Sequence, residues 1–254
     1  MNVLQQVEGD KGVLRWGGLA GVLGGVIFLF VFVFVGAVVG PDPAGPAGPV
    51  TRFPEIKAAR TLENGLYLVV IALFVIHFLA LYRALRGSSL ALALFGSVLA
   101  IVGLAVLAAG ALPHVATTRL SDLYHTAGAT PQHQATVVLL WQANQGIFDS
   151  LLAAGLVLMP IGLVALGVAM LQAPAFGKGF GGATVALGVI GIGSASALLL
   201  DPLSPVAVVG FLALIVFHLV LGWNVHRLSR APVGTGSALP ADERRLAAAD
   251  LGPA

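Results

Sequence analysis

The sequence predicts an all-α membrane protein, a polytopic bundle of six transmembrane helices with no β-sheet. Of its 254 residues 58% are hydrophobic and 9% are charged, whereas soluble domains carry about 25% charged residues. Apolar stretches long enough to cross a bilayer recur along the chain. The basic residues stand beside these stretches rather than in one patch. That pattern is typical of topology signals and excludes a nucleic-acid binder.

The first span is predicted at residues 17–40, which carry no charge. At about 1.5 Å per residue these residues form about 36 Å of helix, enough to cross about 30 Å of hydrocarbon. The stretch is too long for the apolar region of a cleaved signal peptide, which is the competing interpretation. Five further spans are predicted at residues 62–82, 90–112, 134–171, 183–200 and 206–225.

Proline and glycine mark the connections between these spans. Residues 41–50 form a Pro/Gly/Ala linker that we expect to be non-helical. A short polar helix is predicted to begin near Thr51, with Pro54 in its first turn, and to run into the second span. The fourth span is about twice as long as the bilayer core is thick. Residues 134–150 are therefore predicted to extend it toward the outer interface, and Pro160 to kink it.

The chain divides into a cytoplasmic lead (residues 1–16), a transmembrane domain (17–228) and a disordered cytoplasmic tail (229–254). The tail prediction rests on its small, polar and proline-rich composition. Nine of the 13 Lys and Arg residues lie in the lead, in two short connections and at the tail end of the chain. The others lie in the loops 41–60 and 113–136. Basic residues favour the cytoplasmic side. Both termini are therefore predicted to be cytoplasmic, and these two loops to pack together outside as a cap.

The composition, rich in Ala, Gly, Val, Leu and Arg, is typical of a bacterial chain. Together with the multi-pass pattern, it places the protein in the cell inner membrane, with membrane lipid as its surroundings. The oligomeric state is left open.

Small residues recur every four positions on two spans and predict close helix packing there. On the first span they are Gly17, Gly21 and Gly25, and on the fourth they are Gly146, Ser150 and Ala154. The fifth span is small on nearly every face. We therefore expect it to occupy a central place in the bundle.

Three segments carry a resemblance to a known family. They read TLENGLYLVVIAL, YRALRGSSLALALFGSVLAIVGLAVLAAGAL and LVLMPIGLVALGVAMLQAPAFGKGFGGATVALGVIGIG. Over roughly residues 15–228 the chain resembles the bacterial membrane family catalogued as domain of unknown function 4386. The resemblance implies a six-helix integral membrane fold with no established activity. Members of the family place an acidic residue early in the second span, where Glu63 stands in this chain.

Ionisable and amide side chains gather at the outer ends of the second and fourth spans. Steps of three and four place each group on one helix face. The two groups are Arg60, Glu63, Asn64 and Tyr67, and Gln142, Gln145 and Asp149. Such groups are costly inside a membrane and usually have a partner or a purpose. We expect them to form an outer-leaflet polar pocket for a lipid head group, a cation or a small molecule. The alternative is a local Arg60–Glu63 pair and an interhelical hydrogen-bond cluster.

Histidines form two further candidate groups. His77 and His218 each lie about 20 Å from the outer end of their span, so they are predicted to share one depth. Haem ligation, proton relay and mutual hydrogen bonding are the alternatives, and haem is disfavoured because no glycine stands near His77. The outer-loop histidines suit zinc, although their spacing matches no compact zinc signature. They are His114, His125 and His133.

No motif in the chain fixes a reaction. It lacks a G-x-S-x-G elbow, an H-E-x-x-H pair and a P-loop, and it has no cysteine for a thiolate nucleophile. We therefore expect no cofactor, and a non-enzymatic binding or accessory role with lipid or a small molecule as ligand. A small-molecule or ion transporter is the first alternative, and a haem- or metal-dependent membrane enzyme is the second.

Overall fold

The computed structural model describes residues 3–200 and 206–230, which are helical nearly throughout and contain no strand. Six of its helical segments are long and apolar enough to cross a membrane, which confirms the predicted all-α class. One of these segments comprises both α3 and α4. In chain order the elements are α1 (Val3–Phe34), the π-helical turn η1 (Val35–Val39), α2 (Gly48–Leu85), α3 (Leu90–Ala109), α4 (Ala111–Tyr124), α5 (Pro131–Leu171), α6 (Gly177–Leu200) and α7 (Val206–Ser229).

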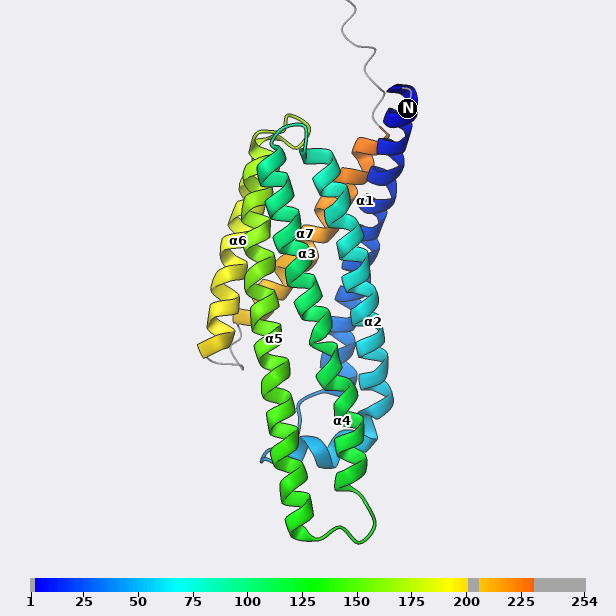
Figure 1. Cartoon of the computed structure of the whole chain (residues 1–254), viewed down its shortest axis with the longest axis vertical. Coiled ribbons are helices and arrows are strands. Elements are labelled where there is room, and N and C mark those ends of the chain that lie inside the picture. The colour runs from blue at the N-terminus through cyan, green and yellow to red at the C-terminus, as the bar shows by residue number, and fades with distance from the viewer. Residues whose placement is uncertain (1–2, 201–205, 231–254) are drawn as a thin grey trace, which may run out of the picture.

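The start of α1 and the end of α7 lie at the same end of the molecule (Figure 1). They are in contact there, since His226 Nδ1 lies 3.3 Å from the carbonyl oxygen of Arg15. We call this end the terminal end and the opposite one, formed by α4 and the neighbouring ends of α2 and α5, the cap end. Because the start of α1 and the end of α7 lie at the same end, the chain runs the length of the bundle an even number of times.

Glycines on α1 let this helix approach two neighbours closely. A side chain at Gly17 would overlap Ala80 of α2, and one at Gly21 would place its Cβ 2.5 Å from His77 Nδ1. At Gly25 the same Cβ would lie 2.9 Å from Leu219 of α7. The predicted packing stripe on the first span is therefore confirmed, and it places α1 between α2 and α7.

The small-residue stripe predicted on the fourth span is wrong. Gly146, Ser150 and Ala154 are exposed, and nothing lies within 4 Å of a Cβ built at Gly146. The close approach uses another face of α5, where Gly155 and Gly162 pack on α3. Spacing alone could not choose between these faces, because both carry small residues at helical intervals.

The central place predicted for the fifth span is also wrong. The corresponding helix, α6, packs only on α5 and α7 among the described elements, so it lies at the edge of the bundle. Gly181 and Gly188 bring it close to α5. Its other faces stay apolar and exposed, which lipid permits without the cost that water would impose.

Several helix boundaries differ from the predicted ones. α2 begins at Gly48, before the predicted start near Thr51. Residues 48–50 are therefore helical, with Pro49 in the first turn. It then continues as one helix through the second span, as predicted. The loop 113–136 is largely helical too, because α4 follows α3 directly after Gly110. The predicted connector 201–205 lies outside the described residues, as does the predicted tail from residue 231 onward.

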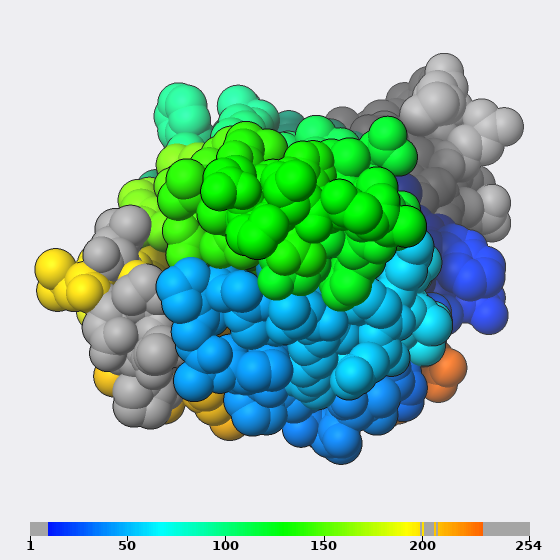
Figure 2. Space-filling model, turned by 90° about the horizontal axis from the view of Figure 1, so that it is seen from below, coloured from blue at the N-terminus to red at the C-terminus, as the bar shows by residue number. Residues whose placement is uncertain are grey.

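The two long loops pack together at the cap end, as predicted. Val50 and Phe53 of α2 form a small apolar core with Trp141 of α5, and the Phe53 and Trp141 rings are 5.4 Å apart. Lys57 and Asp122 join α2 to α4 across 3.4 Å. Seen from this end, the first turns of α2 (blue) lie against residues of α4 and α5 (green) (Figure 2). We call this assembly the cap.

Replacing Gly162 by valine is expected to separate α5 from α3. Its Cβ would lie 2.5 Å from the carbonyl oxygen of Gly96 and 2.6 Å from the amide nitrogen of Ala100, so the backbones must move apart. We expect a loss of about 1–3 kcal/mol in the free energy of unfolding, measured by circular dichroism in mixed dodecyl sulfate micelles. Gly146→Val is the matched control on the same helix, and an equal loss there would contradict this packing.

Candidate functional site

The linker between α1 and α2 folds back over the cap end and is held there by Arg52. Its guanidinium donates hydrogen bonds to the carbonyl oxygens of Val39 and Pro41 and lies 3.7 Å from the carboxylate of Asp42. Gly40 begins the linker with φ of 62°, a conformation that side chains other than glycine's rarely adopt. The end of α1 is thereby fastened to α2.

Beneath this linker lies a cavity of about 550 Å³, which we call the polar cavity. α2, α4 and α5 each contribute polar side chains to it. These are Arg60 and Glu63, His114 and Thr117, and Gln142 and Gln145. The linker closes it with Asp42 and Pro46, and Trp141 and Phe53 form an aromatic wall.

Both signs of charge are present in the polar cavity. Arg60 Nη1 donates to Glu63 Oε2 at 2.9 Å, and the two side chains are 22% and 17% exposed. Because each charge is partly withdrawn from water, pairing offsets much of the cost of burying it. His114 packs its ring 4.4 Å from that of Phe148, and its Nε2 has no hydrogen-bond partner within residues 3–200 and 206–230. A ligand donor or acceptor would satisfy this nitrogen.

A second cavity of about 410 Å³ lies further from the cap end, toward the middle of the bundle, and we call it the apolar cavity. Residues of α1, α2, α4, α5 and α7 line it. Among them are Phe28, Val31, Phe32, Tyr67, Leu152 and Phe211. Glu63, His114 and Phe148 line both cavities. The two spaces therefore adjoin at these three side chains, and we call them together the amphipathic pocket.

The structure brings together most of the polar side chains singled out in the sequence. Arg60, Gln142 and Gln145 line the polar cavity, and Glu63 lines both cavities. The others take separate positions. Asn64 and Tyr67 face the apolar cavity, and Asp149 lines neither cavity but accepts a hydrogen bond from Gln145 Nε2 at 3.3 Å. The ends of α2 and α5 thus share one space.

Sequence reasoning missed three parts of this site. It treated residues 41–50 as a linker and not as a wall, it considered His114 only as a metal ligand, and it did not include Phe148. The Pro113–His114 step after an apolar span was the available signal, since it places an imidazole at the same outer level as Glu63. No pattern in the linker indicates that it folds over the cavity.

The three outer-loop histidines do not converge. His125 Nδ1 lies 2.9 Å from the carbonyl oxygen of Ser121, and His133 Nε2 lies 3.2 Å from that of Leu123. His114 is about 16 Å from His125 along α4. No group of three or more His, Asp or Glu side chains suited to a metal ion occurs in the part of the chain that the structure describes.

His77 and His218 lie in contact, at the common depth predicted for them. Their ring centroids are 5.2 Å apart, and both side chains are fully buried. His77 Nδ1 donates to the carbonyl oxygen of Gly17 at 3.0 Å, and His218 stacks on Phe74 with 3.4 Å between centroids. Two imidazoles that ligate one haem iron stand on opposite faces of the porphyrin. Direct contact between these rings leaves no space for it.

The helices do not separate into two consecutive halves of three. α3 packs on α5, and α7 packs on α1, so helices from both halves of the chain are interleaved. Carriers built from inverted repeats place their binding site between two such halves. The observed pocket instead lies where α1, α2, α4, α5 and α7 meet.

No protein-family model, curated protein or solved structure matches this chain. The resemblance to the family catalogued as domain of unknown function 4386 therefore stays a prediction, and the pocket is the feature from which a function can be inferred.

Replacing Arg52 by methionine is expected to release the linker without unfolding the bundle. The change removes its bonds to Val39 and Pro41 and its ion pair with Asp42, so amide hydrogen exchange of residues 40–47 is expected to rise. Lys57→Met is the matched control, because it breaks another ion pair of the cap that is more exposed. Unchanged exchange in Arg52→Met would contradict the fastening role.

Proposed function

We propose that this chain is an integral membrane protein that binds a lipid in the amphipathic pocket, with the head in the polar cavity and a hydrocarbon chain in the apolar cavity. We place it in a bacterial inner membrane with both termini cytoplasmic and the cap outside, and within the family named above. We propose a binding or accessory role rather than catalysis.

One observation carries this proposal: a polar and an apolar cavity meet at Glu63, His114 and Phe148. Their volumes, about 550 and 410 Å³, fall in the range of pockets that hold small molecules. A purely polar solute would leave the apolar cavity unfilled, and a purely apolar one would leave the Arg60–Glu63 pair and His114 unused. An amphiphile fills both.

The head group must supply most of the selectivity. A chain that moves from lipid into the apolar cavity gains no hydrophobic free energy, because lipid tails are as apolar as the cavity wall. Hydrogen bonds to charged groups contribute about 1.5–3 kcal/mol each. Arg60 and Glu63 offer both signs of charge, and Gln142 and Gln145 offer amides. These side chains favour a zwitterionic or uncharged polar head over a strongly anionic one.

Trp141 lines the polar cavity and provides a local optical probe. The other tryptophans, Trp16 and Trp223, are 67% and 55% exposed and can be replaced by phenylalanine. Titration of this single-tryptophan protein with hexadecylphosphocholine in maltoside micelles is expected to shift the Trp141 emission saturably. A linear response that never saturates would count against a defined site.

Glu63→Gln is expected to weaken this binding about ten-fold, the equivalent of one hydrogen bond to a charged group. The amide cannot hold Arg60 as an ion pair and offers the head no negative charge. Glu55→Gln is the matched control, since Glu55 is exposed on the same helix and lines neither cavity. Equal affinity in the two variants would remove Glu63 from the head-group site.

Leu152→Trp is expected to abolish the saturable response by filling the apolar cavity. Leu152 lines that cavity one turn below Phe148. Ile147→Trp adds the same indole on the same helix, but at a side chain that is 55% exposed to the surroundings. The control is expected to bind normally, and loss of binding in both variants would indicate a general effect on α5.

A further inference from the structure

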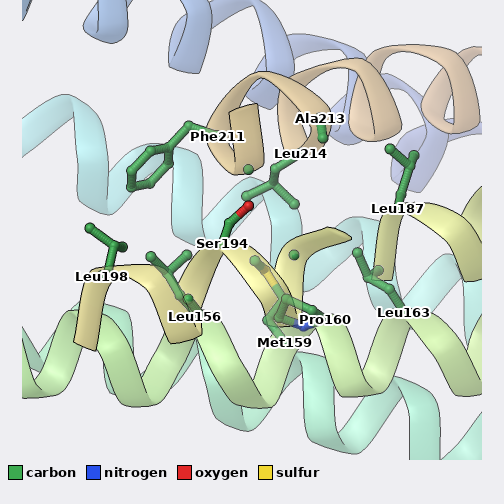
Figure 3. A pocket seen from close by; sticks show the side chains of 13 residues that line it. Leu156, Met159, Pro160, Leu163, Leu187, Ser194, Leu198, Phe211, Ala213 and Leu214 are labelled. Carbon is green, nitrogen blue, oxygen red and sulfur yellow. The ribbon is translucent and has the colours of Figure 1, made fainter. Parts of the chain in front are cut away.

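Two further cavities lie deeper in the bundle along α7. A small cavity of about 30 Å³ lies between α5, α6 and α7 (Figure 3). Phe211 lines both this cavity and the apolar cavity. In Figure 3 Phe211 and Leu198 stand at one end of the small cavity and Leu187 at the other. Leu187 in turn lines a fourth cavity of about 300 Å³, nearer the terminal end.

These spaces follow one line because of how α7 packs. α7 contacts α1, α2 and α6 but makes no close backbone approach to α5. Only side chains fill the space between α5 and α7, and the fourth cavity, lined by α6 and α7, lies beyond it toward the terminal end. We call this line of cavities the seam. It is walled largely by flexible apolar side chains, among them Leu156, Met159, Leu163 and Leu214. Leu and Met side chains have several staggered rotamers, so a change of rotamer can open this wall to a chain.

The seam carries almost no polarity. Among the described residues, no charged side chain lines the small cavity or the fourth one. Thr184 donates its hydroxyl to the carbonyl oxygen of Phe180 at 2.9 Å, while the buried Ser194 hydroxyl has no partner in the part of the chain that the structure describes. A charged head could not follow this route without a large desolvation cost. Hydrocarbon could.

The length of the seam decides what kind of hydrocarbon fits. From Phe148 to Leu163 along α5 is about 22 Å, and from Leu187 to Gly179 along α6 adds about 12 Å. One leaflet of hydrocarbon is about 15 Å thick. The seam therefore extends past the bilayer midplane, further than a chain confined to one leaflet.

We propose, on the basis of the function proposed above, that the bound lipid has a chain long enough to cross the midplane along the seam. The ligand class is a long-chain lipid, of very long acyl or polyisoprenoid type, with its polar head held at the cap. The protein selects this lipid by chain length as well as by head group. It holds the lipid and does not flip it, because the head stays in the polar cavity.

Photolabelling of the full-length protein tests this proposal. Phosphocholines with one dodecyl or one docosyl chain each carry a diazirine, either next to the head or at the chain end. They are added to protein in phosphatidylethanolamine and phosphatidylglycerol vesicles, with unlabelled probe as competitor, and labelled peptides are identified by mass spectrometry. Head-proximal diazirines are expected near Phe148. The chain-end diazirine of the docosyl probe is expected near Leu187, and that of the dodecyl probe near Phe211.

Ala213→Phe provides a second, independent test, because its larger side chain is expected to block the seam. Ala213 lines the small cavity and is half-buried, so a larger side chain can be accommodated there. The docosyl label near Leu187 is expected to be lost, while dodecyl labelling stays unchanged. Leu212→Phe, at a neighbouring side chain that is 42% exposed, is the matched control and is expected to behave as the unaltered protein.

The outcomes separate the two proposals. Absence of competable head-proximal labelling would overturn the proposed function itself. Head-proximal labelling accompanied by docosyl chain ends on α1 near Phe28, or on surface residues only, would overturn the seam proposal alone. Docosyl labelling at Leu187 that persists in Ala213→Phe would also overturn it.

Discussion

Close backbone approach at glycine holds this bundle together, and the position of the pocket depends on it. Lipid gives apolar helices no hydrophobic reason to associate, so dense packing must do so. Gly17 and Gly21 bring α1 onto α2, while Gly18 and Gly25 bring it onto α7. Gly162 brings α5 onto α3. These contacts determine which helices are neighbours, and cavities remain where helices do not approach closely.

The position of the pocket follows from these helix contacts. α7 is held by α1 at the terminal end, so it leaves α5 without a close contact, and the apolar cavity and the seam lie between them. At the cap end the aromatic contact of Phe53 with Trp141 brings the two loops together over the polar cavity. An amphipathic space therefore arises between two well-packed groups of helices, with its polar part where water is nearest.

Parts of the candidate site could be predicted from residue spacing. Arg60 and Glu63 stand three positions apart, and a helix places such residues on one face, so their ion pair was an expected alternative. Gln142 and Gln145 were found by the same argument. Asp149 follows the same spacing yet lines neither cavity, because a helix face curves away from a neighbour that it crosses. The linker wall and Phe148 depend on contacts between distant segments, which no local pattern encodes.

The sequence by itself determined the all-α class and the six apolar segments, because length and hydropathy are local properties and a bilayer has one thickness. The two longest polar loops, 41–60 and 113–136, could also be expected to meet in a cap. Only the tertiary structure decided which small residues pack, for Gly146 and Gly162 lie on one helix, and of the two only Gly162 meets a neighbouring helix. The reason is geometric: a glycine permits close approach on any face, and the partner's shape selects the face that is used.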